Sequence, residues 1–64
     1  MPISGKEMLK LYLADGWIIL RQRGSHVVVG KGKLRQVIPV HGNKDLKRGL
    51  ERALLRVLNA KKED

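Results

Sequence analysis

The sequence predicts an α+β domain in which a helix, three antiparallel strands and a second helix follow one another (α-β-β-β-α). Apolar residues recur with helical spacing near both ends of the chain and form short β-branched runs in the middle. Short connections containing glycine separate the middle runs, as in an antiparallel meander. A chain of 64 residues forms one small core, so we expect a single domain with both helices on the same face of the sheet.

The first helix is expected over residues 5–14. The stretch SGKE, residues 4–7, has the pattern of a capping box, and apolar residues continue from it with helical spacing. Asp15-Gly16 provides a stop, because glycine readily adopts the left-handed conformation. We expect Tyr12 and Trp17, the two aromatic residues of the chain, to pack in the core rather than to stack on bases.

Three strands are expected between the helices, at residues 17–22, 26–29 and 34–40. The connecting segments are RGS (residues 23–25) and GKGK (residues 30–33), both rich in turn-forming residues. Pro39 has no N–H to donate to a neighbouring strand, so the third strand should lie at the edge of the sheet or end there.

The second helix is expected over residues 49–58. Leu50, Ala53, Leu54, Val57 and Leu58 recur at i, i+3, i+4, i+7 and i+8, which predicts one apolar face. Asn59 is expected to cap this helix, and we expect residues 1–3 and 60–64 to fray.

Positive charge is concentrated in the middle of the chain. The formal net charge is +8 at pH 7, and the segment from Arg21 to Arg48 holds eight lysines and arginines against one acid, Asp45. The flanking segments hold six basic and five acidic residues and are nearly balanced. This distribution favours binding to a polyanion such as RNA, the alternative being a solvated surface that keeps a small protein soluble.

Several classes of function are disfavoured by composition. The chain has no cysteine, and its two histidines and six scattered acids form no cluster at metal-ligand spacing, so we expect no disulfide, metal or other cofactor. No apolar run approaches the length of a membrane span, and the first residues lack a signal-peptide core. We therefore expect a soluble cytoplasmic protein without a membrane partner.

The stretch RQRGSH, residues 21–26, contains the first candidate for catalysis. RNA cleavage requires a group that removes the 2′-OH proton and one that protonates the leaving 5′-oxygen, and imidazole does both near neutral pH. Arg21, Arg23 and Ser25 could hold a phosphate beside His26, and strand alternation places Val27 on the opposite face from His26. The alternative is that His26, at the start of a strand, only caps a turn or bonds to a backbone carbonyl.

The loop that precedes the second helix contains further candidates for RNA contact. Lys44, Lys47 and Arg48 could position phosphates near the first amides of that helix. His41 is a possible second catalytic histidine, but antiparallel pairing alone does not place it beside His26. From the sequence we favour a structural or RNA-contacting role for His41.

The α-β-β-β-α order is the topology of the double-stranded RNA-binding fold, and three stretches make a closer resemblance. GKEMLKLYLADGW, RQRGSH and VIPVHGNKDLKRGL, in this order and spacing, closely resemble the HicA toxin family of bacterial toxin–antitoxin systems. The resemblance covers nearly all of the chain from residue 4 to residue 58. It implies a small toxin that cleaves mRNA without the ribosome, uses one histidine and is silenced by a HicB-type antitoxin.

Matched position by position, the catalytic histidine of this family falls on His26. The chain has Val27 where many relatives have a second histidine, and Val29 where they have an aromatic residue. It has KRGL at residues 47–50 where many relatives have Lys-Pro-Gly-Thr. The alternative to a ribonuclease is a non-catalytic RNA-binding or protein-interaction module of the same fold.

Overall fold

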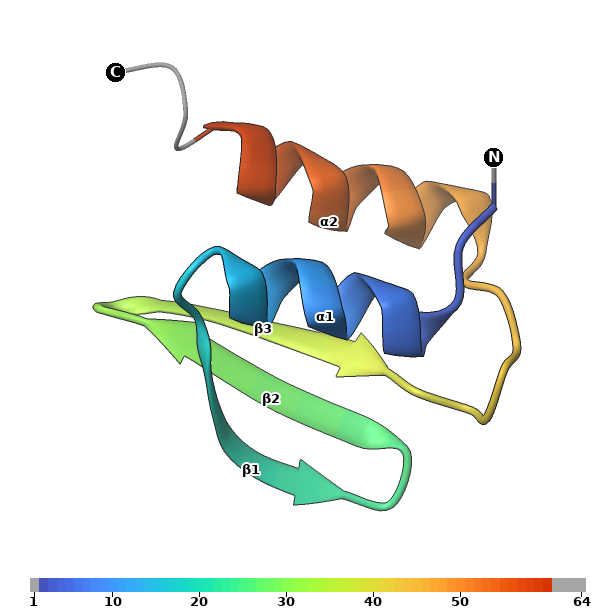
Figure 1. Cartoon of the computed structure of the whole chain (residues 1–64), viewed down its shortest axis with the longest axis horizontal. Coiled ribbons are helices and arrows are strands. Elements are labelled where there is room, and N and C mark those ends of the chain that lie inside the picture. The colour runs from blue at the N-terminus through green and yellow to red at the C-terminus, as the bar shows by residue number, and fades with distance from the viewer. Residues whose placement is uncertain (1, 61–64) are drawn as a thin grey trace.

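The computed structural model describes residues 2–60 and confirms the predicted α-β-β-β-α architecture (Figure 1). Its elements, in chain order, are α1 (Gly5–Ala14), β1 (Ile18–Arg23), β2 (His26–Lys31), β3 (Leu34–Pro39) and α2 (Arg48–Ala60). The strands form one antiparallel sheet in the order β1-β2-β3, with β2 in the centre. The arrangement fits the fold of double-stranded RNA-binding domains, as the sequence predicts.

The capping box at the start of α1 is present as predicted. The Ser4 side chain accepts a hydrogen bond from the Glu7 amide at 3.1 Å, and the Glu7 carboxylate accepts one from the Ser4 amide at 2.9 Å. At the other end, Asp15 caps the helix and Gly16 adopts a φ of 96°, a left-handed conformation that favours glycine. The two signals at residues 4–7 and 15–16 therefore define α1.

The two hairpin turns are tighter than the sequence predicts. Arg23 lies in β1 rather than in the first turn, and β2 continues to Lys31, beyond the predicted end at Val29. The second turn consists of Gly32 and Lys33 alone, with Gly32 at a φ of 59°. The short turn fixes the register, in which Lys31 pairs with Leu34 and His26 with Pro39. β3 is an edge strand and ends at Pro39, as expected for a residue that cannot donate to a ladder.

One hydrophobic core lies between the sheet and the helices. Its buried residues come from every element except β1, and they are Met8, Tyr12, Trp17, Val27, Val29, Ile38, Leu46, Leu54 and Leu58. The Tyr12 and Trp17 rings meet edge to face with centroids 4.8 Å apart, which confirms both as core residues. The Tyr12 hydroxyl donates to the Leu54 carbonyl at 2.8 Å and ties α1 to α2.

The second helix differs from the prediction at both ends and on its apolar face. It begins at Arg48 and continues through Asn59, so Asn59 is not its cap. Leu54 and Leu58 are buried, whereas Leu50 and Ala53 are exposed. Figure 1 shows that α1 lies over β3 and that α2 lies beyond α1. The side chains of α2 that pack in or against the core are those of Leu54, Leu55, Val57 and Leu58.

The ends of the domain are held by specific contacts. The Ile3 amide donates to Glu51 Oε1 at 3.2 Å, and the Ile3 carbonyl accepts from the Leu46 amide at 2.9 Å. Ile3 also packs against the core, and Ala60 is helical. The fraying expected at residues 1–3 and 60–64 stays a prediction, and of these residues 1 and 61–64 lie outside the described part of the chain.

Candidate functional site

The sheet presents one face to the helices and the other to solvent, and His26 lies on the solvent face. Val27 and Val29 are 2% and 0% exposed and point into the core, so His26 and Val28 point away from it. His26 is exposed. We call this solvent-exposed side of β1, β2 and β3 the open face. It carries the predicted catalytic residue, as strand alternation indicates.

A β-bulge in β1 determines which of its side chains share the open face. Ile19 pairs with Val29 and Arg21 pairs with Val28, so Leu20 is an extra residue between two consecutive pairs. Directly paired residues point to the same face. The bulge therefore turns Arg21, and with it Arg23, onto the open face, where unbroken alternation from Ile19 would point both toward the helix side.

Arg23 pairs directly with His26, so a guanidinium and an imidazole occupy neighbouring positions of the open face. Arg21 pairs with Val28, one step further along the same face. Among residues 2–60 the ion pair present is between Lys31 and Asp15, at 3.5 Å, and it involves neither arginine. The charges of Arg21 and Arg23 are thus available to an anion.

The structure brings His41 beside His26. His26 pairs with Pro39, and the Val40 amide donates to the Ser25 carbonyl at 2.6 Å, which extends the ladder past the end of β3. His41 therefore lies diagonally across from His26, and the two rings are 6.4 Å apart between centroids, at an angle of 79°. Two exposed imidazoles face the same space at one end of the open face.

Ser25 contributes to this cluster through His41. Its Oγ lies 3.4 Å from Nε2 of His41, at the long end of hydrogen-bond distance. The hydroxyl can donate to this nitrogen or accept from it, according to the protonation of the ring. Ser25 thus orients the His41 ring, a contact that the Gly-Ser-His spacing does not reveal.

A pocket of about 440 Å³ is lined by His41. Its polar wall consists of His41, Lys44, Asp45 and Lys47. Its apolar wall is formed by residues of β3, the following loop and α2, namely Pro39, Leu46 and Leu50. The structure therefore places two of the predicted RNA-binding residues, Lys44 and Lys47, around one cavity with the second histidine.

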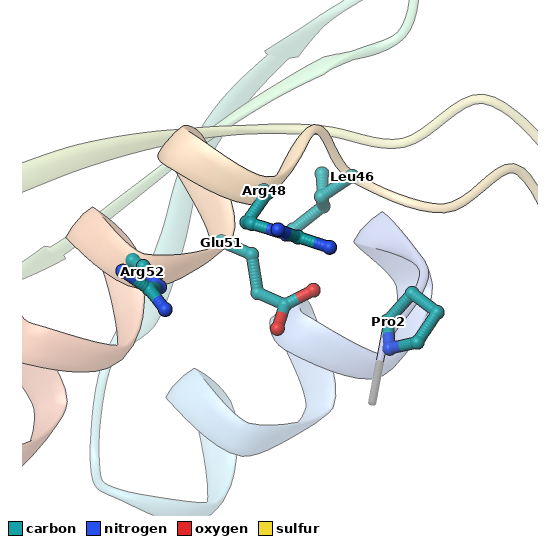
Figure 2. A pocket seen from close by; sticks show the side chains of 5 residues that line it. All are labelled: Pro2, Leu46, Arg48, Glu51 and Arg52. Atoms are coloured by element: carbon teal, nitrogen blue, oxygen red, sulfur yellow. The ribbon is translucent and has the colours of Figure 1, made fainter.

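Arg48 lies elsewhere. It lines a second, larger pocket of about 510 Å³ together with Pro2, Leu46, Glu51 and Arg52 (Figure 2). In that view Arg48 and Glu51 project into the same space, and the Glu51 carboxylate holds the Ile3 amide. Because the carboxylate in this pocket is engaged by the Ile3 amide and neither histidine lines the pocket, we regard it as part of the clamp on residue 3. Arg48 is thus separated from the predicted partners Lys44 and Lys47.

Leu20 and Arg35 also lie at the open face, and neither was predicted there from the sequence. A Cβ at Gly30 would lie 2.7 Å from Leu20 Cδ1 and 3.0 Å from Arg35 Nη1, so both side chains cover this glycine. Arg35 also donates to the carbonyls of Gly32 and Leu34, each at 2.8 Å. Arg35 lies on the open face because it pairs with Gly30, and this pairing can be predicted only when the register of the β2–β3 hairpin is known.

Two further findings bear on the class of site. No group of three or more histidine, cysteine, aspartate or glutamate residues that could hold a metal ion is present in the described part of the chain. None of the helices within residues 2–60 is both long and apolar enough to span a membrane.

The fold and the site together define a class: a small α+β domain, built like a double-stranded RNA-binding domain, that presents two neighbouring histidines on a basic sheet face. A family model described as the HicA toxin of bacterial toxin–antitoxin systems matches residues 5–60. The chain therefore belongs to the HicA toxin family, and this membership implies an antitoxin partner. Comparisons with curated proteins and with solved structures return no match.

The open face is unaffected by two of the sequence differences from many relatives. Val27 and Val29 are both buried against the helices, on the opposite side of β2 from His26. A histidine or an aromatic residue at these positions would alter packing first. The third difference, at residues 47–50, spans Lys47 and Leu50, which line the pocket beside His41.

Proposed function

We propose that this toxin is a metal-independent endoribonuclease that cleaves mRNA without the ribosome. The observation that carries the proposal is the pair of exposed imidazoles, His26 and His41, with ring centroids 6.4 Å apart on a basic face. Cleavage by the neighbouring 2′-OH needs one base and one acid on opposite sides of the phosphorus, each within about 3 Å of its oxygen. Two histidines at this separation suit that requirement.

In the proposed mechanism one imidazole removes the proton of the 2′-OH, whose oxygen then attacks the adjacent phosphorus. The bond from phosphorus to the 5′-oxygen breaks, and the other imidazolium gives its proton to that oxygen. The products are a 2′,3′-cyclic phosphate and a 5′-OH. Arg23, next to His26, offsets the negative charge that develops on the phosphorane.

The surrounding cations hold the RNA backbone. Arg21 and Arg23 contact phosphates along the open face, and Ser25 orients His41 for the reaction. Lys44 and Lys47 hold the strand beyond His41, and Arg48 makes a more distant backbone contact from the far side of Leu46. Such contacts fix the position of the RNA and make its affinity depend on salt.

The antitoxin partner is proposed to be a HicB-type protein that covers the open face. A face that carries three arginines and two histidines is complementary to an acidic surface, and coverage of His26 excludes RNA. We place the toxin in the cytoplasm, where mRNA is its substrate. The proposal for the partner rests on family membership and on this charge pattern.

The test is incubation of the purified chain with an end-labelled single-stranded RNA in EDTA. We expect cleavage that leaves 2′,3′-cyclic phosphate and 5′-OH ends, and none when 2′-O-methyl groups replace the 2′-hydroxyls. RNA binding without cleavage would favour a non-catalytic RNA-binding module instead. The absence of both would leave a protein-interaction module.

A substrate with a better leaving group separates the roles of the two histidines. A linkage with sulfur in place of the 5′-oxygen leaves without a proton, so the variant that lacks the acid should regain activity on it. We expect this recovery for either His26→Ala or His41→Ala and not for both. His41→Gln keeps a polar partner for Ser25 but transfers no proton, and it should resemble His41→Ala on ordinary RNA.

A further inference from the structure

The pocket beside His41 has more apolar wall and more acid than phosphate binding requires. Pro39, Leu46 and Leu50 form one side of it, and Leu50 is 37% exposed although it is a large hydrophobic residue. Its volume of about 440 Å³ lies in the range of about 300–1,000 Å³ that is typical of small-molecule sites. A flat apolar group can pack against this side of the pocket while a negatively charged group attached to it contacts the lysines.

Asp45 is the feature that a phosphate site does not explain. It is the one acid between Arg21 and Arg48, and it lines the same pocket as Lys44 and Lys47. Its carboxylate makes no ion pair or hydrogen bond among the described residues, although two lysines line the pocket with it. A free carboxylate weakens the binding of a bare phosphate, so its presence points to a ligand that donates hydrogen bonds.

The backbone at Asp45 is held firmly. Asp45 forms an isolated antiparallel bridge with Ser4, and the next amide, of Leu46, donates to the Ile3 carbonyl at 2.9 Å. Leu46 is itself only 8% exposed. The backbone that carries the Asp45 side chain is therefore fixed within an otherwise irregular loop, as suits a residue that selects a ligand.

We propose that this pocket is a nucleobase subsite, next to the cleaved phosphate, in which Asp45 selects bases that carry an exocyclic amine. The proposal rests on the proposed ribonuclease function. The base packs against Pro39 and Leu50, and Lys44 and Lys47 hold its phosphate. The carboxylate accepts from the exocyclic amine of cytosine, adenine or guanine, and it disfavours uracil, which has no exocyclic amine and whose N3–H lies between two carbonyl oxygens.

The test uses oligonucleotides with one ribonucleotide in a 2′-O-methyl background, so that a single phosphate can be cleaved. Each base is varied in turn on both sides of that phosphate. On one of the two sides of that phosphate, we expect substrates with cytosine, adenine or guanine to be cleaved about 10-fold faster than substrates with uracil. Asp45→Ala should remove this ratio, and Asp45→Asn should narrow it, because the amide can donate to uracil.

The ratio of the cleavage rates with cytosine, adenine or guanine to the rate with uracil distinguishes base selection from a general effect of charge. Both variants remove one negative charge, so an electrostatic effect alone would change the rates on all bases equally and leave the ratio at its wild-type value. Active wild-type protein without base preference, or a ratio unchanged in Asp45→Ala, would overturn the subsite and leave the ribonuclease in place.

A binding measurement distinguishes failure of the subsite from failure of the nuclease. Amide chemical shifts of the whole wild-type chain are followed as cytidine or uridine monophosphate is added. Larger shifts at Lys44 and Leu50 with the cytidine nucleotide, lost in Asp45→Ala, support the subsite even if no RNA is cleaved. The absence of such shifts together with the absence of cleavage would defeat both proposals.

Discussion

The two faces of the sheet are made by the same strands and have opposite contents. On β2, Val27 and Val29 are buried under the helices, while His26 on the other side is exposed. The packed face holds the hydrophobic core of the domain, and the open face holds Arg21, Arg23 and Arg35 and the histidine pair. Successive residues of one strand therefore serve different purposes: one set stabilises the fold, and the other set carries the side chains of the candidate site. Substitution of neighbouring positions should therefore have different kinds of effect.

The largest expected contrast is between His26 and Val27. His26→Ala should lower the rate of RNA cleavage by about 10²–10⁴-fold, because one proton-transfer group is lost, with little change in the free energy of unfolding. Val27→Ala should cost about 2 kcal/mol of stability and leave the histidine in place. Cleavage rates and urea unfolding of both variants check this. Undiminished cleavage by His26→Ala would remove it from the mechanism.

Two glycines test the difference between a tightly packed position and one without close neighbours. A Cβ at Gly5 would lie 1.9 Å from the Pro39 carbonyl oxygen, so Gly5→Ala must separate α1 from β3. We expect a loss of about 3 kcal/mol in the free energy of unfolding. Gly49, in the first turn of α2, has no such neighbour within 4 Å, and Gly49→Ala should stabilise the domain by about 0.5 kcal/mol. Thermal unfolding of the two variants would contradict this account if their shifts had the same sign.

Tyr12 makes the packed side sensitive to alkali. Burial, aided by the charge of Asp15, raises the pKa of Tyr12 from 10.0 to about 12. The folded state holds this proton more tightly than the unfolded state. The protonated hydroxyl therefore makes its full contribution to the free energy of unfolding below pH 10, and this contribution is lost as the pH rises toward 12. Tyr12→Phe should lose about 1 kcal/mol through the missing bond to Leu54. Urea unfolding between pH 8 and pH 11 should show a smaller decline for the variant than for the wild type.

The smallest expected effects are those of single arginines on the open face. Arg21→Ala or Arg23→Ala should weaken RNA binding and lower the slope of log affinity against log salt by about 1 each. Arg56, an exposed residue of α2, is the matched control, and Arg56→Ala should keep the wild-type slope. Binding titrations at several salt concentrations give these slopes. Equal slopes for all three variants would mean that RNA binds elsewhere.

The order of elements and the buried side of β2 were predictable from the sequence because each rests on a local pattern. The capping box, Asp15-Gly16 and the alternation at residues 26–29 depend on near neighbours in the chain. Leu50 and Ala53 were placed wrongly in the core because helical periodicity shows which residues share a face, not how much of that face is covered. Coverage depends on how α2 lies against α1.

The neighbourhood of the two histidines could not be predicted for a different reason. Strands ending at Val29 and beginning at Leu34 would pair those residues and place His26 opposite Val37. The observed two-residue turn pairs Lys31 with Leu34 and moves His26 opposite Pro39, next to His41. The bulge at Leu20, which directs Arg21 and Arg23 to the open face, likewise has no clear signal in the sequence. Both features are non-local.

The clamp on Ile3 has a consequence for the synthesis of the toxin. Ile3 is bonded to Leu46 and Glu51, and Asp45 is bridged to Ser4, so the loop that carries His41 is positioned by residues 3 and 4, and Ile3 is in turn held by the first turn of α2. A nascent polypeptide that has not yet reached Glu51 lacks this support, whatever part of the sheet has already formed. The loop that carries His41 is therefore fully supported only after the first turn of α2 has been synthesised.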